Sequence, residues 1–242
     1  MSRTLSVLAL GALLSACSDP ELERRVQDLE AKVAALESRG PAAPMGAAPA
    51  ANPEQEQAAA ALLKEATLAV DQMQYDVAKE KVAVLKAEYG STRAAKASAR
   101  IEQELAIVGK PEAPLKVEKW YQGSDADAHG KATMYVIWEV WCPHSRKEVP
   151  RLTETYDRFH GAGLSIVGVT RQTKDVTDEQ VTDFIRDNKV SYPIAKDASS
   201  GLSDYYGVRG IPAAAVVKDG VVVWRGHPAK VSDEMLNGWL GR

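Results

Sequence analysis

The chemistry of this chain centres on one cysteine. Cys142 and Cys17 are the only two cysteines among 242 residues, so the sequence has neither a disulfide framework nor a cysteine-rich zinc site. Cys142 follows an apolar, β-favouring run that ends at Trp138, and it precedes a segment, 146–159, that can form a helix. At the start of a helix, free N–H groups and the positive end of the dipole stabilise a thiolate over a thiol. We therefore predict that Cys142 is a nucleophile.

The pattern after Pro114 predicts the elements that must hold this cysteine in place. Short β-favouring runs alternate with segments of helical periodicity, which is typical of an α/β domain. A β-α-β beginning followed by an antiparallel hairpin and a helix predicts a mixed sheet flanked by helices. The predicted elements are strands at 117–121 and 132–138, a helix at 146–159, a strand at 164–170, a helix at 178–188, a strand at 192–195, a short helix at 202–206, a hairpin of 213–218 and 220–225, and a helix at 232–240.

Two segments carry a family resemblance. The run from Trp138 to Pro150, with Cys142-Pro143-His144-Ser145 at its centre, resembles the active-site segment of thioredoxin-like proteins. It is most similar to the exported, membrane-tethered TlpA/ResA group. Farther along the chain, the run from Gly207 to Pro212 resembles the cis-proline loop of that fold, with Pro212 in the proline position. The resemblance covers residues 113–242 and implies a thioredoxin-like domain with a mixed sheet flanked by helices.

The resemblance also implies roles for four candidate catalytic residues. Cys142 is the attacking cysteine, and Ser145 stands where the family has its second cysteine, close enough to donate a hydrogen bond to the thiolate. His144 either favours the thiolate as a charged or donor group inside the turn, or is a solvent-exposed histidine without consequence. Glu148 either accepts the proton of an incoming thiol or only solvates the first turns of the helix.

Four further residues are candidates for substrate binding. The resemblance implies a cis Ile211–Pro212 peptide pressed against the nucleophile, where exposed backbone groups pair with an extended substrate. Trp141 and Pro143 flank the nucleophile in the sequence. We expect Trp138 and Trp141 to frame the groove, although tryptophan in this setting is as often part of the core as of a contact surface. These expectations place the substrate strand between the start of the active-site helix and the proline loop.

The missing second cysteine limits the chemistry. In the family's C-x-x-C motif, the first thiolate attacks a disulfide and the second cysteine resolves the mixed disulfide, but the Ser145 hydroxyl cannot form a disulfide. Monothiol exchange is left open, in which Cys142 acts on disulfides of envelope proteins or on low-molecular-weight thiols. An external thiol, or one supplied by a partner protein, then completes the turnover. The alternative is a catalytically silent thioredoxin-like scaffold that binds extended peptides in the cell envelope.

Composition and spacing exclude several other classes. With 30 basic and 33 acidic residues, the formal charge is −3, which gives no basic field for nucleic acid. No glycine-rich phosphate loop is present, so a nucleotide cofactor has no support. His129, His160 and His227 lack the spacing of metal ligands. The sequence therefore predicts no cofactor, no metal and no nucleic-acid partner.

The N-terminus predicts export and a lipid anchor. Residues 1–16 have a basic residue, a short apolar run and small residues, which is the layout of a signal peptide. Leu14-Ser15-Ala16-Cys17 resembles the lipobox of bacterial lipoproteins, so we expect lipidation of Cys17 and attachment to a membrane. This predicts a periplasm-facing protein of the bacterial cell envelope, with the choice between inner and outer membrane left open.

Three segments connect the expected anchor to the α/β domain. Residues 17–39 contain a heptad-like apolar seam, which predicts a short coiled-coil stalk and a possible homo-oligomer through residues 21–38. Residues 40–53 form a linker rich in proline and alanine. Residues 54–110 are weakly similar to a tetratricopeptide repeat and predict three helices, with Gly90 as a left-handed C-cap. This all-α region is either a spacer or a protein-binding surface.

Overall fold

The computed structural model describes residues 51–242. The predicted signal peptide 1–16, the lipidation of Cys17, the stalk at 21–38 and nearly all of the linker at 40–53 lie outside the described residues. Within residues 51–242, no helix combines the length and the apolar character needed to cross a membrane.

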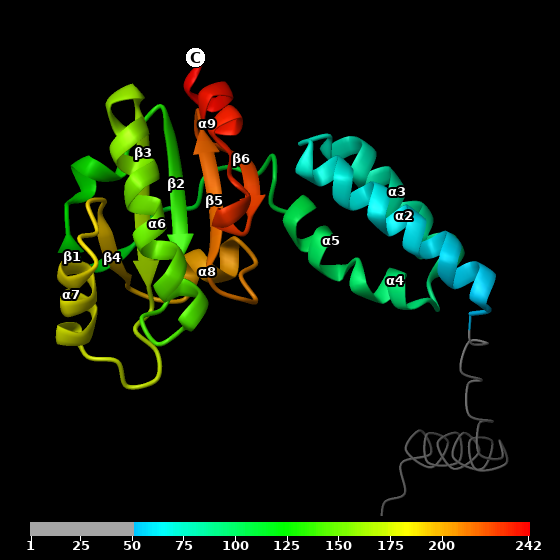
Figure 1. The fold of residues 1–242 in the computed structure, drawn as a ribbon, viewed down its shortest axis with the longest axis horizontal. Helices are drawn as coiled ribbons and strands as arrows, with labels where there is room; N and C mark the ends of the chain where they lie inside the picture. The colour runs from blue at the N-terminus through cyan, green and yellow to red at the C-terminus, as the bar shows by residue number, and fades with distance from the viewer. Residues whose placement is uncertain (1–50) are drawn as a thin grey trace, which may run out of the picture. The chain divides into compact units, whose positions relative to one another are not determined.

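A six-stranded mixed sheet forms the centre of the domain, in the order β1-β4-β3-β2-β5-β6 (Figure 1). β2, β3 and β4 are parallel, whereas β1, β5 and β6 each pair antiparallel to a neighbour. This topology confirms the predicted thioredoxin-like sheet. The strands are β1 (Val117–Gln122), β2 (Ala132–Ile137), β3 (Leu164–Thr170), β4 (Ile194–Asp197), β5 (Ala213–Lys218) and β6 (Val221–Gly226).

Helices cover both faces of this sheet. They are α6 (Pro143–Phe159), α7 (Asp178–Asp187), α8 (Gly201–Tyr205) and α9 (Asp233–Leu240), with 3-10 turns η1 (Asp125–Ala128), η2 (His160–Ala162) and η3 (Pro228–Lys230). Successive side chains of a strand point to opposite faces. Met134 and Val136 of β2 therefore pack into a core with α6, α7 and α9, while Tyr135 and Ile137 pack into a second core with α8.

The predicted elements are confirmed with small shifts at their ends. α6 begins at Pro143, three residues earlier than predicted, because Cys142 is the N-cap and proline suits the first helical position. The strand predicted at 192–195 instead occupies Ile194–Asp197. Asp219 and Gly220, with φ values of 52° and 73°, form the turn of the β5–β6 hairpin.

The helical region contains four helices rather than three. They are α2 (Pro53–Asp71), α3 (Tyr75–Tyr89), α4 (Arg93–Ala97) and α5 (Ala99–Leu105). The predicted left-handed C-cap at Gly90 is wrong, since its φ is −56°. The Thr92 N–H donates to the carbonyl of Tyr89, and the Thr92 side chain caps α4, so the turn closes with right-handed backbone. At the break between α2 and α3, Met73 is in the left-handed conformation, with a φ of 58°.

The segment after α5 covers the edge of the sheet. The N–H of Gly109 donates to the carbonyl of Val222, and the N–H of Val222 donates to the carbonyl of Lys110. In addition, the Tyr75 hydroxyl donates to the carbonyl of Val223 at 3.1 Å. Three backbone groups of β6, the N–H and carbonyl of Val222 and the carbonyl of Val223, are therefore satisfied by this segment and by α3.

Candidate functional site

Cys142 lies at the junction of strand and helix that the sequence predicts. It is the N-cap of α6, and its carbonyl accepts the hydrogen bond of the Arg146 N–H at 2.9 Å. The residue is 6% exposed. Its Sγ atom lies 3.7 Å from the carbonyl oxygen of Ile211, to which the thiol donates. The sulfur therefore faces the proline loop.

The sheet brings these two segments together although they are far apart in sequence. Ile137 at the end of β2 is paired with Ala213 at the start of β5. Because the strands are antiparallel, the loop that follows β2 and the loop that precedes β5 lie at the same end of the sheet. The Ile211–Pro212 peptide bond is cis, as predicted. Topology therefore places Cys142 beside the cis proline.

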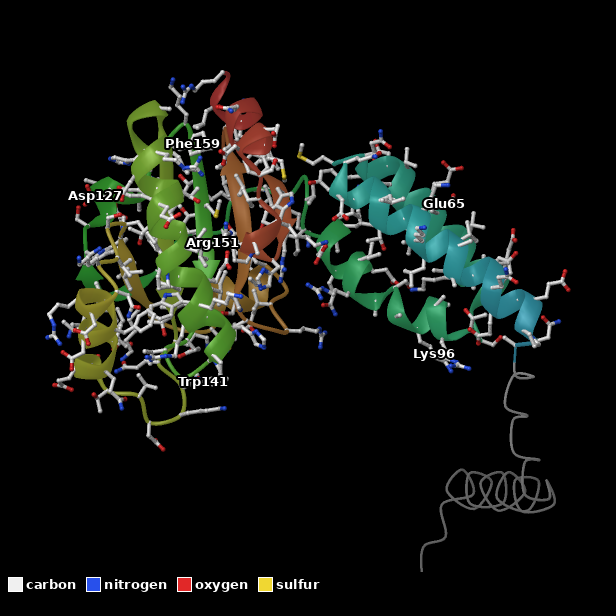
Figure 2. All side chains as sticks on the ribbon, in the orientation of Figure 1. Glu65, Lys96, Asp127, Trp141, Arg151 and Phe159 are labelled. Atoms are coloured by element: carbon white, nitrogen blue, oxygen red, sulfur yellow. The ribbon has the colours of Figure 1, made fainter. Side chains whose placement is uncertain are left out.

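Ser145 and Glu148 have partners other than the sulfur. Ser145 is fully buried, and its hydroxyl accepts a hydrogen bond from the backbone N–H of Glu139 at 3.4 Å. The buried carboxylate of Glu148 accepts from Nε of Arg151 at 2.9 Å, and Arg151 also donates to the carbonyl of Pro228. Figure 2 labels Arg151 on α6. The Glu148–Arg151 pair thus joins α6 to η3.

The two tryptophans separate into core and surface. Trp138 is fully buried against Phe184, so the expectation that it frames the groove is wrong. Its side chain packs in the same core as Met134 and Val136, as strand alternation dictates. Trp141 is 37% exposed and lies beside the loop that follows β3 (Figure 2).

This loop, residues 171–177, is held to the active-site segment by Glu139, which sequence reasoning left without a role. Glu139 is buried, and its carboxylate accepts hydrogen bonds from the Thr170 hydroxyl and from the N–H groups of Arg171 and Thr173, all at 3.2 Å. The sequence does contain a signal for this role, since Glu139 directly follows an apolar strand. A carboxylate that is buried there is costly unless hydrogen-bond donors surround it.

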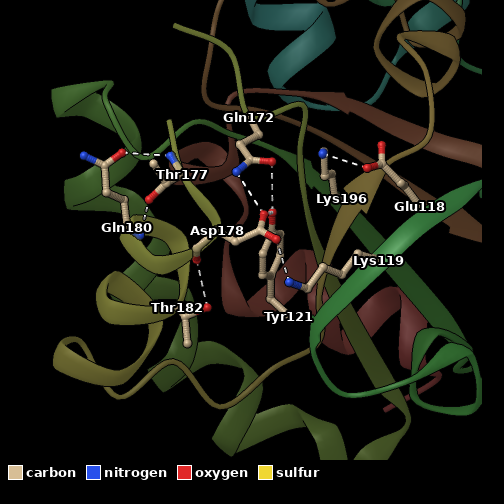
Figure 3. A network of polar contacts seen from close by, with 9 residues as sticks. All are labelled: Glu118, Lys119, Tyr121, Gln172, Thr177, Asp178, Gln180, Thr182 and Lys196. Carbon is tan, nitrogen blue, oxygen red and sulfur yellow. Dashed lines mark hydrogen bonds and ion pairs between the residues drawn. The ribbon is translucent and has the colours of Figure 1, made fainter. Parts of the chain in front are cut away.

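Asp178 holds the other end of the same loop (Figure 3). Its carboxylate accepts from Lys119 and the Tyr121 hydroxyl at 2.6 Å each, and from the Gln172 amide at 2.9 Å. The hydrogen bonds of Lys119 and then Tyr121 lower the pKa of Asp178 to about 2. Between the two carboxylates, Gln172, Lys174 and Asp175 have φ values of 55° to 60°, which non-glycine residues rarely adopt.

The loop in turn positions Trp141. The indole N–H donates to the Thr173 hydroxyl at 2.9 Å, and Nζ of Lys174 lies 3.4 Å from the centre of the ring. Trp141 is therefore fixed on one side of the nucleophile, with 37% of its surface exposed.

A cavity of about 590 Å³ lies on the other side, at the proline loop. His144, Ile211 and Pro212 line it, together with residues of α5 and β6. His227 also lines it; its Nδ1 accepts from the Ala229 N–H, and burial is the main cause of the lowered pKa of this imidazole. The cavity thus brings together three of the predicted site residues. No group of side chains that could hold a metal ion occurs within residues 51–242.

Comparisons with known proteins show which proteins this chain resembles. A family model described as "AhpC/TSA family" matches residues 110–225. The chain is 30% identical over 145 residues to "Thiol-disulfide oxidoreductase ResA" of Bacillus thuringiensis (strain Al Hakam), covering 57% of this chain and 80% of that protein. It is 26% identical over 110 residues to "Sporulation thiol-disulfide oxidoreductase A" of Bacillus subtilis (strain 168), covering 46% and 67%. Among solved structures, StoA from Bacillus subtilis matches with a TM-score of 0.44 and 25% identity, over 54% of this chain and 98% of that one.

Proposed function

The chain belongs to the thioredoxin-like redoxins of the AhpC/TSA family, with thiol-disulfide oxidoreductases of the ResA type as its homologues, and from this we propose that it exchanges thiols and disulfides through Cys142 alone. The observation that carries the proposal is the position of the sulfur, 3.7 Å from the carbonyl of Ile211 next to the cis proline. Ser145 three residues later restricts the reaction to one protein thiol.

The proposed reaction has two stages. The Cys142 thiolate attacks one sulfur of a substrate disulfide; that S–S bond breaks, a mixed disulfide forms, and the other half of the substrate leaves as a thiolate. An external thiolate then attacks the sulfur of Cys142, which releases the second half of the substrate. A second external thiolate frees Cys142. The substrate gains two electrons and two protons, and two external thiols become one disulfide.

The neighbouring residues support this reaction in different ways. The cis peptide at Pro212 leaves backbone groups available to an extended substrate, and Trp141 offers an aromatic face beside them. We propose that His144, at the start of α6, assists the thiolate, and that the Ser145 hydroxyl donates to it when the proton leaves. Glu148 is proposed as the acceptor of the proton of the incoming thiol, for which it would have to leave Arg151.

We further propose where the reaction occurs. The signal-like residues 1–16 and the lipobox-like sequence that ends in Cys17 support an exported lipoprotein, anchored in the membrane of the bacterial cell envelope. Its substrates would then be disulfides of envelope proteins or of low-molecular-weight thiols, in a compartment where disulfides persist. The segment 21–38 is the candidate for self-association.

One observation favours a second function. Cys142 is only 6% exposed, and its thiol donates a hydrogen bond to a carbonyl, a contact that requires the sulfur to keep its proton. A protein with a protonated, covered thiol would act as a binding scaffold for extended peptides rather than as an enzyme.

Trapping distinguishes the two functions. Cells would express the chain with Cys142 or with Cys142→Ala, thiols would be blocked with acid and an alkylating agent, and attached proteins would be identified. We expect mixed disulfides that depend on Cys142. In a second measurement, the alkylation rate of Cys142 at pH 6 is compared with that of free cysteine. If no Cys142-dependent adduct forms and alkylation is no faster than for free cysteine, the scaffold function holds instead.

A further inference from the structure

The proposed reaction needs an external thiol, and the cavity at the proline loop is placed to receive one. His144, Ile211 and Pro212 line this cavity of about 590 Å³. The carbonyl of Ile211 is also the group that Cys142 Sγ contacts at 3.7 Å. Cys142 itself does not line the cavity, but a molecule in it lies against Ile211, the residue that the sulfur contacts, and against His144, two residues after the nucleophile. The volume is within the range of sites for small molecules, roughly 300–1,000 Å³.

The cavity has an excess of positive charge. Three arginines line it: Arg100 of α5, Arg209 of the loop before the cis proline, and Arg225 of β6. Glu104 is the one carboxylate among the lining residues that the structure describes, and it lies 3.5 Å from Arg100. One acidic and three basic side chains leave two positive charges that no lining carboxylate balances. Such a lining attracts anions.

Arg225 shows that part of this charge is built into the fold. The residue is 9% exposed, and its Nε and Nη2 atoms donate to the carbonyls of Tyr206 and Gly207 at 3.0 and 3.3 Å. These carbonyls satisfy hydrogen bonds but do not neutralise the guanidinium, and within residues 51–242 Arg225 has no ion pair. The carboxylate that acts on Arg225 is that of Glu104, and Glu104 is also paired with Arg100, so one carboxylate serves two guanidinium groups. A buried cation that is only partly compensated is costly, and an anion in the cavity would lower this cost.

We propose that this cavity binds the thiol that resolves the mixed disulfide, and that this thiol is a small molecule carrying carboxylate groups. This inference rests on the proposed function. The carboxylates lie against Arg100, Arg209 and Arg225, and the thiolate points toward Cys142. When it attacks the sulfur of Cys142, the bond to the substrate breaks, the substrate leaves as a thiolate, and the small molecule becomes disulfide-bonded to Cys142 in the cavity.

The test compares two thiols that differ in charge. Cys142 of a Cys17→Ser chain is capped with a 2-thiopyridyl group, and its release is followed by absorbance with glutathione, which has two carboxylates, or with glutathione diethyl ester, which has none. The release rate with each thiol is divided by the concentration of that thiol's thiolate form, because the thiolate is the species that attacks. We expect glutathione to be about tenfold faster, and the ratio to fall with added salt.

Variants locate the effect. In the double variant Arg100→Gln, Arg209→Gln, which changes two exposed side chains, the ratio should fall to about two or less. Arg93→Gln, an exposed arginine of the same helical region that does not line the cavity, should keep the ratio of the wild type. A wild-type ratio near one, or a ratio that the double variant leaves unchanged, overturns the inference. If neither thiol releases the group faster than from a short cysteine peptide, the proposed function itself fails.

Discussion

The two sides of Cys142 differ in the sign of their charged groups and in whether those groups have partners. On the side of Trp141, two carboxylates, Glu139 and Asp178, each accept three hydrogen bonds from loop or neighbouring groups. On the side of the cis proline, Arg209 and Arg225 line a cavity without an ion pair among residues 51–242. Polar groups that are already satisfied fix a structure, whereas charges left without counter-charges are available to a ligand.

This difference indicates that one side of the sulfur atom is held in a fixed structure and that the other side is open to a ligand. The loop 171–177 has three residues in left-handed conformations, Gln172, Lys174 and Asp175, which persist only where the surrounding contacts hold them. It presents Trp141 in one geometry. The proline side instead has open volume beside His144 and Ile211. We therefore expect changes on the first side to alter stability and changes on the second to alter exchange.

The largest expected effect comes from giving the protein its own second sulfur. In Ser145→Cys, the new thiol would resolve the mixed disulfide internally, so the amount of adduct trapped in cells should fall about tenfold or more. The preference for an anionic external thiol should be lost as well, because the cavity is no longer needed for resolution. The measurement is quantitative mass spectrometry of the Cys142 adducts.

Ser145→Ala is the matched control for that variant, since it removes the hydroxyl without adding a thiol. It should still accumulate adduct, less than the wild type because the hydroxyl proposed to donate to the thiolate is gone, but several times more than Ser145→Cys. Equal trapping by Ser145→Cys and Ser145→Ala would contradict the view that the missing cysteine controls the fate of the mixed disulfide.

Glu139→Ala should have the next largest effect, on the other side of the sulfur. It leaves the N–H groups of Arg171 and Thr173 and the hydroxyl of Thr170 without an acceptor. We expect the free energy of unfolding to fall by about 2–4 kcal/mol, measured by urea denaturation. As a control, Glu154→Ala removes an exposed carboxylate of α6 and should change the free energy of unfolding by less than about 0.5 kcal/mol. An equally small change for Glu139→Ala would contradict the claim that this carboxylate holds the loop.

Thr173→Ala should have a smaller effect, because Trp141 is exposed. Losing the hydroxyl removes the acceptor of the indole N–H, and we expect a loss of about 0.5–1 kcal/mol. In NMR spectra with labelled tryptophan, the Trp141 indole signal should shift and broaden, while that of the buried Trp138 should stay in place. An unshifted Trp141 signal would show that the loop does not hold the ring.

The smallest expected effect is on stability in acid. Because the folded pKa of Asp178 is lowered to about 2, its contribution to stability is complete above its ordinary pKa near 3.8 and is lost as the pH falls through about 2. Lys119→Met should raise the pKa of Asp178, since Lys119 is the largest cause of the lowering. Carboxyl NMR titration measures this. Lys196→Met, which removes the partner of Glu118 instead, should leave Asp178 unchanged.

The sequence predicts the nucleophile and the fold because their signals are local. An apolar strand, a cysteine and a proline in succession specify the start of α6, and Pro212 marks its loop. The fate of Trp138 could also have been predicted: it continues the alternation of Met134 and Val136, which places it in the core. Glu139 gave a weaker signal, because two of its three donors, the N–H groups of Arg171 and Thr173, come from a loop that the sequence does not place.

The cavity could not be predicted, since its charges come from elements that are distant in the chain. Arg100 lies in α5, Arg209 in the loop before β5, and Arg225 in β6. Nothing in their spacing indicates that they meet. Only the pairing of strands and the packing of α5 near β6 bring the three side chains around one volume.

The pairing of Gly109 and Lys110 with Val222 of β6 has a consequence for any attempt to isolate the redox domain. A chain shortened to residues 113–242 would lose these partners, and a bare strand of the hairpin would be left free to pair with a second molecule. Such a fragment would also lack Arg100 and Glu104, so it would report the reactivity of a different cavity. The α-helical region is in this sense part of the redox domain's own surface.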